Sequence, residues 1–195
     1  MLVRKPDSDL KDSAYDFLKV VFPAMVEQGF LSGELIPVES VTTSEMTRRL
    51  DMLSGIDSWA IKEPDGITGI ASRVQWGWKP FNTFTIRKSR LSGVSTELEK
   101  RQRAIESNGQ YLYPYWTVQA YLTQVHGQLL TIGMARTMDV VEIITKYPNK
   151  ERPTKDGGAV FGYCEWDMMQ FEGYDVKIFD NSAEMVSVAM VRKLH

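Results

Sequence analysis

The sequence has few of the residues that build the commonest catalytic centres. Its 195 residues include one cysteine, Cys164, and two histidines, His126 and His195. One thiol cannot form an internal disulfide or a multi-cysteine zinc site, and two histidines are too few for a histidine-rich metal centre. Cys164 lies in an apolar run, where we expect a buried, unreactive thiol. We therefore expect a protein of a reducing compartment, the cytoplasm.

Charge, hydropathy and motifs exclude further classes. With 23 basic and 25 acidic side chains the net charge is −2, which excludes a globally basic, histone-like binder but leaves room for a local basic patch. No stretch approaches the roughly 18 apolar residues that cross a bilayer, so we expect no membrane association. The motifs "GxxxxGK[ST]", "GxGxxG", "GxSxG" and "HExxH" are missing. NTPase, dinucleotide-dependent oxidoreductase, α/β-hydrolase and zincin readings therefore have no support.

What is present predicts an α/β fold, with α+β as the open alternative. At 43% hydrophobic and 25% charged residues, we expect one domain over residues 1–195, with a helical part at 8–53 and a mixed-sheet core at 54–195. The first helix begins near Ser8 or Asp9, and Pro23 is expected to end or kink it. A short second helix is expected after Thr43 or Ser44.

The rest of the chain alternates strands with helices. The runs "IDSWAIKE", "GITGIASRVQWG" and "FNTFTIRKSR" predict an antiparallel meander of three strands. "STELEKRQRAIES" predicts a capped surface helix, and "TMDVVEIITKYP" predicts another helix after two strands that meet at "VHG". "NKERPTKDGG" has the composition of a flexible surface loop, and "AVFGYCEWDMMQF" reads as a strand on which Glu165 and Asp167 point the same way.

The first hairpin, "GIDSWAIKEPDGITGIASRVQW", has the form of a metal-binding nuclease hairpin. Phosphodiester hydrolysis with magnesium needs carboxylate ligands and gains from a cation that stabilises the developing negative charge. A widespread solution places an aspartate near the start of one strand and an acid-x-lysine on the next. Here Asp57 opens the first strand, and the second strand carries Arg73, Val74 and Gln75.

This arrangement resembles the PD-(D/E)XK, or restriction-endonuclease-like, superfamily, and within it the RecB-type nucleases. Asp57 matches the first metal-binding aspartate, Gln75 falls at the lysine position and Arg73 at that of the second acid. Gln119 is the counterpart of a late glutamine that the family carries on a helix, although here it lies in a strand-like run. The resemblance implies a restriction-endonuclease-like core and a nuclease that acts on DNA rather than RNA.

If the nuclease is active, the resemblance implies Mg²⁺ or Mn²⁺ held by Asp57 with help from Glu27 on the first helix. Gln75 would orient the attacking water, and Arg73 or Lys88 would contact the phosphate. Other acids could replace Glu27, and we weigh Glu45, Asp51, Glu97 and Glu99.

The departures from the motif support a second hypothesis. Arg73 would repel a metal ion, and Gln75 removes the expected cation, so the chain could be an inactive nuclease-fold module that binds DNA or a protein as an accessory or inhibitor. A structural reading makes Arg73 the salt-bridge partner of Asp57 across the hairpin. The size and the degenerate motif are typical of phage or mobile-element proteins.

A second candidate region is basic and aromatic. "WGWKPFNTFTIRKSR" combines Trp78 with Lys79, Arg87, Lys88 and Arg90, and such cations neutralise phosphates while exposed rings stack on bases. Strict strand alternation would place Arg87 opposite Lys88 and Arg90. The following helix could extend the patch through Arg101 and Arg103. The alternative is that the aromatic rings belong to the core and the cations protect a sheet edge.

Overall fold

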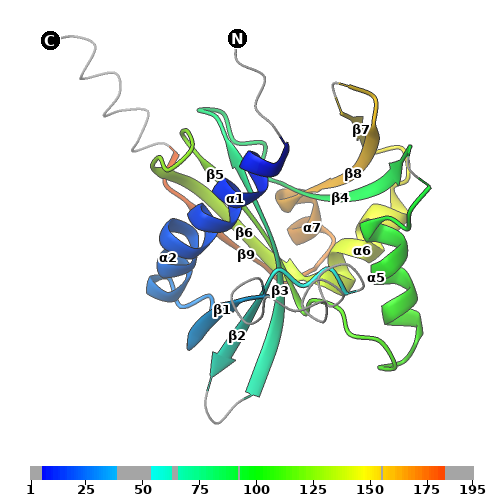
Figure 1. The fold of residues 1–195 in the computed structure, drawn as a ribbon, viewed down its shortest axis with the longest axis horizontal. Helices are drawn as coiled ribbons and strands as arrows, with labels where there is room; N and C mark the ends of the chain where they lie inside the picture. Colours follow the sequence, from blue (N-terminus) through cyan, green and yellow to red (C-terminus); the bar gives the residue numbers. More distant parts are fainter. Residues whose placement is uncertain (1–5, 39–53, 63–65, 92, 155, 183–195) are drawn as a thin grey trace, which may run out of the picture.

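The computed structural model describes residues 6–38, 54–62, 66–91, 93–154 and 156–182 and has the mixed α/β fold that the sequence predicts (Figure 1). Its described part contains two sheets, one of six strands and one of three. None of its described helices is long and apolar enough to cross a membrane. The helix expected after Thr43 or Ser44 lies outside the described residues, as do the candidate acids Glu45 and Asp51.

The helices are short, and the strands account for most of the regular structure. The described helices are α1 (Pro6–Asp16), α2 (Phe22–Glu27), α5 (Glu97–Glu106), α6 (Thr137–Lys146) and α7 (Trp166–Phe171). The larger sheet contains β1 (Glu34–Pro37), β2 (Ser58–Lys62), β3 (Gly66–Trp76), β5 (Trp116–Leu122), β6 (Leu129–Arg136) and β9 (Val176–Asp180). The smaller sheet contains β4 (Thr83–Arg90), β7 (Glu151–Pro153) and β8 (Ala159–Glu165).

The larger sheet runs in the order β1-β2-β3-β5-β6-β9 and forms the middle layer of the molecule. Only β3 and β5 are parallel neighbours; the other pairs are antiparallel. Apolar side chains of the helical segment Phe17–Val21 and of α2 cover one face, where Val21 and Met25 pack with Ile70 and Val74 of β3. The other face packs against β4, α6 and α7, with Tyr121 of β5 in the shared core.

The N-terminal helix passes Pro23 instead of ending before it. A π-helical turn, Phe17–Val21, links α1 to α2, and the backbone N–H of Phe22 donates to the carbonyl of Phe17. Proline cannot donate the next helical hydrogen bond, and the wider turn just before it absorbs this irregularity. The helix therefore does not stop at Pro23, and the irregularity expected there is the π-helical turn just before it.

The predicted three-stranded meander is only partly correct. β2 and β3 form the expected antiparallel hairpin, with Ser58 opposite Ile70. The third run, β4, leaves this sheet and pairs with β8, with Phe84 opposite Cys164. Burial explains the change, because Phe84 and Ile86 are fully buried in the core that lies against α5, α6 and α7. The two sheets therefore separate between β3 and β4 (Figure 1).

A β-bulge in β4 overturns the expected alternation of its cations. Arg87 pairs with Phe161, yet Ser89 pairs with Val160 and Arg90 with Ala159, so one residue of β4 has no partner of its own. Because Ala159 and Phe161 lie on one face of β8, Arg90 shares a face with Arg87 and is not opposite to it.

Two C-terminal expectations also need correction. The segment expected to be an irregular loop contains β7, which pairs with β8. The strand that begins at Ala159 ends at Glu165, and Trp166 starts α7, so Glu165 and Asp167 do not share a strand face. Trp166 is fully buried against Gly133 of β6, where a Cβ atom would lie 2.2 Å from its ring. This close contact fixes the end of β8 against the larger sheet.

Candidate phosphate-binding site

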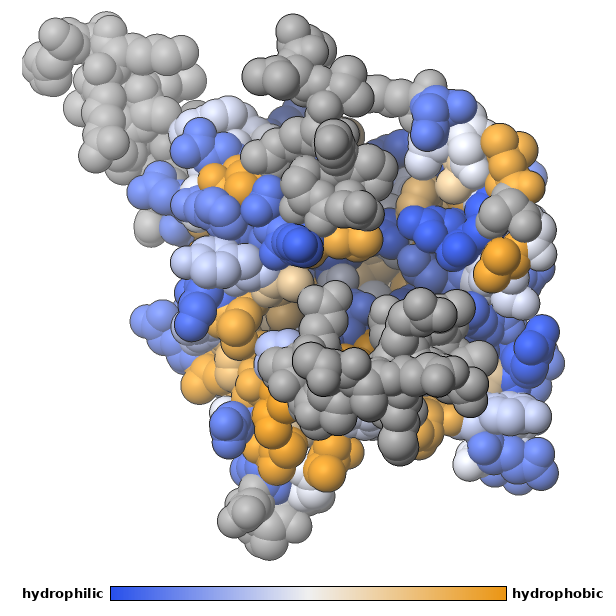
Figure 2. All heavy atoms as spheres, viewed as in Figure 1, coloured by the Kyte–Doolittle hydropathy of each residue, from blue (hydrophilic) through white to orange (hydrophobic). Residues whose placement is uncertain are grey.

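The site lies between the two sheets, on the face of β3 that points away from α1 and α2. Arg73 and Gln75 share this face, because their partners in the parallel β5 are Gln119 and Tyr121, and these two contact β4. Figure 2 shows hydrophilic residues gathered around the hollow between the sheets. The hairpin that the sequence predicts thus places Arg73 and Gln75 toward the second sheet.

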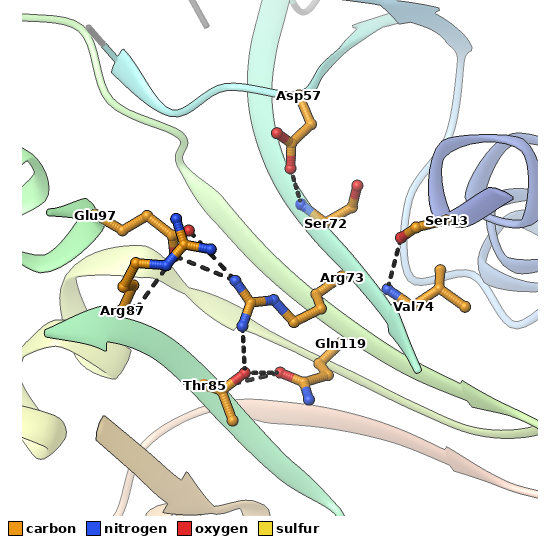
Figure 3. A network of polar contacts seen from close by, with 9 residues as sticks. All are labelled: Ser13, Asp57, Ser72, Arg73, Val74, Thr85, Arg87, Glu97 and Gln119. Carbon is orange, nitrogen blue, oxygen red and sulfur yellow. Dashed lines mark hydrogen bonds and ion pairs between the residues drawn. The ribbon is translucent and has the colours of Figure 1, made fainter. Parts of the chain in front are cut away.

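Asp57 lies next to this face, and its carboxylate has a structural task. Its Oδ2 accepts a hydrogen bond from the backbone N–H of Ser72 at 2.6 Å (Figure 3). β2 begins only at Ser58, so among the described residues the β3 backbone beyond Ile70 has no strand partner on that side. Asp57 satisfies the first exposed donor and the Ser13 hydroxyl of α1 the next, at the N–H of Val74, 3.2 Å away.

Arg73 reaches across to the second sheet and does not pair with Asp57. Its guanidinium donates to the Thr85 hydroxyl at 3.2 Å and to the Glu97 carboxylate at 3.3 Å (Figure 3). The amide oxygen of Gln119 accepts from the backbone N–H and the hydroxyl of Thr85, both at 3.0 Å. The alternative reading of an Asp57–Arg73 salt bridge is therefore wrong, since Glu97 takes that place.

The helix α5 sets the position of Glu97. Thr96 caps this helix, and its hydroxyl accepts from the Glu99 backbone while the Glu99 side chain accepts from the Thr96 backbone. The capping box confirms the helix that the sequence predicts and fixes Glu97 in its first turn. From there the Glu97 carboxylate also accepts from the backbone N–H of Arg87 at 3.4 Å.

Positive charge dominates around Glu97. Burial raises the pKa of its carboxyl, yet three neighbouring guanidinium groups outweigh this effect and hold that pKa below its ordinary value. In order of strength they belong to Arg73, Arg101 and Arg87. We call Arg73, Arg87, Arg90 and Arg101, together with Glu97, the arginine cluster.

Arg101 is the most deeply placed member of the cluster. It lies on the inner face of α5 between Leu98 and Ala104, with 6% of its surface exposed. Burial lowers the pKa of its guanidinium, while Glu97 and Asp57 raise it. Within the described residues, its Nε and Nη1 atoms are buried without a hydrogen-bond partner. The prediction that Arg101 and Arg103 extend one patch is therefore only half right, because Arg103 is exposed to solvent.

Two further arginines have unpaired donors. The Nε atoms of Arg87 and Arg90 are buried and have no hydrogen-bond partner within the part of the chain that is described. Burial lowers the pKa of the Arg87 guanidinium, and repulsion from Arg73 and Arg90 lowers it further, against the attraction of Glu97. Buried donors of this kind normally have partners. The cluster thus has an excess of positive charge and of donors that an anion would satisfy.

A divalent cation does not fit this arrangement. α2 covers the opposite face of the sheet, so Glu27 is exposed there and is not brought together with Asp57. Among the described residues, no three acidic, histidine or cysteine side chains are grouped closely enough to hold a metal ion. Glu97 is surrounded by guanidinium groups, which repel a metal ion. The residues described here favour an anion over Mg²⁺ or Mn²⁺.

The other predicted nucleic-acid residues fall into two groups. Trp78 and Lys79 are exposed in the loop between β3 and β4, with Trp78 58% exposed. Lys88 points to the opposite side of β4, where its ammonium donates to the Pro148 carbonyl at 3.0 Å and pairs with Glu151. Lys88 therefore anchors the segment before β7 and does not belong to the arginine cluster.

The sequence indicated Phe81 as part of the basic, aromatic run, but it did not indicate Phe161, Tyr163 and Arg152 as parts of the site. The guanidinium groups of Arg73 and Arg87 lie over the ring of Phe161, 4.6 and 5.2 Å from its centroid. Arg152 of β7 lies between two further rings, those of Phe81 and Tyr163. The alternation of Phe161 and Tyr163 in "AVFGYCE" was the available signal, but it did not indicate which face the rings share.

A second polar cluster joins α1 to the turn between β5 and β6. Asp16 is fully buried and accepts from the Trp76 indole at 2.8 Å. It also accepts from the backbone N–H of His126 at 3.1 Å, and its other oxygen lies 2.8 Å from the ring Nδ1 of that residue. His126 adopts a left-handed φ of 54° in this turn. These contacts give the histidine a structural role.

No family model matches the chain, and no curated protein matches it either. The function is therefore inferred from the geometry of the site itself.

Proposed function

We propose that this protein binds nucleic acid and that the arginine cluster receives one of its phosphate groups. The observation that carries the proposal is the set of buried guanidinium nitrogens of Arg87, Arg90 and Arg101, which have no hydrogen-bond partner within the described residues. Arg87 and Arg101 lie near the carboxylate of Glu97, and Arg90 lies near Arg87. Phosphate supplies several acceptor oxygens and negative charge, which is what unpaired arginine donors require.

The arrangement supports binding in preference to hydrolysis. At the position of the second acid, Arg73 makes an ion pair with Glu97, and the Asp57 carboxylate caps the Ser72 backbone. These contacts favour the hypothesis of a nuclease-fold module that binds DNA without cleaving it. Metal-dependent cleavage with Mg²⁺ or Mn²⁺, which the resemblance to the PD-(D/E)XK superfamily implies, stays a prediction. We also propose a cytoplasmic location, in keeping with the single free thiol of Cys164.

The test is a binding and cleavage panel on the full chain. Fluorescently labelled duplex DNA, single-stranded DNA and RNA are titrated by anisotropy, with EDTA or with Mn²⁺, and the products are resolved on a denaturing gel. The variants are Arg101→Met and, as the matched control on the exposed face of the same helix, Arg103→Met. We expect binding in EDTA that Arg101→Met weakens roughly 10-fold or more, with Arg103→Met close to the wild type.

Three results would contradict the proposal. If no nucleic acid binds at salt near the physiological range, the function is wrong. If the two variants lose affinity equally, the cluster is not the phosphate site. Metal-dependent cleavage that Asp57→Ala abolishes would restore the nuclease hypothesis in place of the binding module.

A further inference from the structure

We infer that the arginine cluster continues into a track for single-stranded nucleic acid along the face of the smaller sheet that carries Phe161 and Tyr163, and that this track opens to solvent at Phe81 and Arg152. This inference rests on the proposed function and extends it to the class of substrate. The track consists of three aromatic rings and three cations: Phe81 just before β4, Arg152 of β7, Tyr163 and Phe161 of β8, Arg87 of β4 and Arg73 of β3.

The outer part of the track is a stack of two rings around one guanidinium. The Arg152 guanidinium carbon lies 4.6 Å from the centroid of the Phe81 ring and 4.9 Å from that of Tyr163. Phe81 is 55% exposed, and Arg152 is exposed as well. Contact with two rings orients the guanidinium, and its N–H groups stay available for an anion. We call these three residues the stack.

The stack and the arginine cluster lie on one face of β8. Tyr163 and Phe161 are two residues apart in this strand, so their side chains project in the same direction about 7 Å apart. Arg152 of β7 is registered opposite Phe161, and Arg87 of β4 is registered opposite Phe161 from the other side. The ring of Phe161 therefore connects the stack to the buried guanidinium groups.

Among the described residues, the acids near this face already have basic partners, and Glu97 pairs with Arg73. The acids of this sheet already have lysine partners: Glu151 pairs with Lys88 and Glu165 with Lys150. Among the described residues, no acidic side chain pairs with Arg152. An exposed cation held between rings, next to arginines with unpaired donors, is complementary to a polyanion.

The rings favour a single strand over a duplex. Unpaired bases expose their faces and stack on aromatic side chains, and duplex bases are already stacked on one another. A duplex would contact only the cations through its phosphates. Phe81, and with it Trp78 in the same loop, leaves more than half of its surface in water, which a base would cover.

The decisive probe is a single strand without bases. Anisotropy titrations of the full chain compare a 12-residue oligothymidine, a duplex of the same length and a 12-residue abasic strand with the same number of phosphates. Phe81→Ala removes the outer ring of the stack. Phe171→Ala is the control, because Phe171 is 92% exposed at the end of α7, outside the track. Arg101→Met removes a donor of the arginine cluster.

We expect the wild type to bind oligothymidine most tightly. Phe81→Ala should weaken that binding roughly 5- to 100-fold and leave the abasic strand unaffected, whereas Phe171→Ala changes neither. Arg101→Met should weaken binding of all three probes. Equal affinity for the three probes, with no effect of Phe81→Ala, would overturn the track and leave the phosphate site standing. Failure of all three probes to bind would overturn the proposed function as well. Binding of a labelled polyglutamate in that case would identify an acidic protein as the partner.

Discussion

The stability of the fold does not explain why the Arg101 side chain is buried. Its buried Nε and Nη1 lack partners within the described residues, and an unsatisfied buried cation is costly. We therefore expect Arg101→Met to leave the free energy of unfolding unchanged or to raise it by about 1–2 kcal/mol, while nucleic-acid affinity falls. Urea unfolding of the free protein measures this. A loss of more than about 2 kcal/mol would assign Arg101 a structural role.

Two substitutions of Asp57 distinguish its hydrogen bond to the Ser72 backbone from metal binding. Asn retains an acceptor for the Ser72 N–H but is a poorer metal ligand, and Ala removes both functions. We expect Asp57→Ala to lower the free energy of unfolding by about 1–3 kcal/mol and Asp57→Asn to lose clearly less. Equal destabilisation by the two variants in urea titrations would show that the hydrogen bond at 2.6 Å is not what Asp57 contributes.

Glu97 makes the stability of the folded protein depend on pH. Its pKa is depressed in the folded protein relative to the ordinary value of 4.5, so its stabilising effect is fully present above pH 4.5 and is lost as the pH falls through the folded pKa. We expect the wild type to be more stable than Glu97→Gln at pH 7, with the difference shrinking below about pH 4.5. Thermal unfolding of both proteins from pH 7 to pH 3 checks this; a constant difference would contradict it.

At the scale of elements, the contact of α1 with the turn between β5 and β6 depends on Asp16. Its buried carboxylate holds the Trp76 indole and the His126 backbone together. Asp16→Ala leaves these donors without their acceptor, and we expect it to lower the free energy of unfolding by about 2–3 kcal/mol. Ser13→Ala, which removes the weaker contact to Val74, should cost less. The reverse order in urea unfolding would show that Asp16 does not anchor the helix.

Hairpins, helix caps and single strands could be predicted from the sequence, because each depends on residues that are close together in the chain. The hairpin of β2 and β3, the Thr96 cap of α5 and the strands on either side of His126 are all confirmed. The partner of β4 could not be read, because Phe84 pairs with Cys164, which lies 80 residues further along the chain. The bulge that places Arg90 beside Arg87 is also set by β8 and leaves no pattern in β4 itself.

The site was predictable to a similar extent. Arg73, Gln75 and Asp57 were recognised as neighbours from the hairpin, and Arg87 and Arg90 from the basic run. The counter-charge was not predicted to be Glu97, nor was Arg101 expected to face inward, because α5 is charged on most of its sides. Only the packing of α5 against β4 decides which of its charges is buried.

At the scale of the whole molecule, the shared core between the two sheets protects Cys164. Burial raises the pKa of its thiol to about 12, so at pH 8 the folded protein has roughly 1000-fold less thiolate than a thiol with pKa 9.0. We expect very slow reaction with a thiol reagent in buffer and fast reaction in urea. Fast labelling of the folded protein would show that the layer of β8, α6 and α7 opens readily.

The central claim is that buried arginine donors between the sheets bind a nucleic-acid phosphate. The most direct measurement is the salt dependence of oligonucleotide affinity for the wild type, Arg101→Met and Arg103→Met. A phosphate contact releases counterions, so we predict that Arg101→Met lowers the affinity and reduces the slope of log K against log salt concentration by about one, while Arg103→Met keeps the wild-type slope. An unchanged slope for Arg101→Met would contradict the claim.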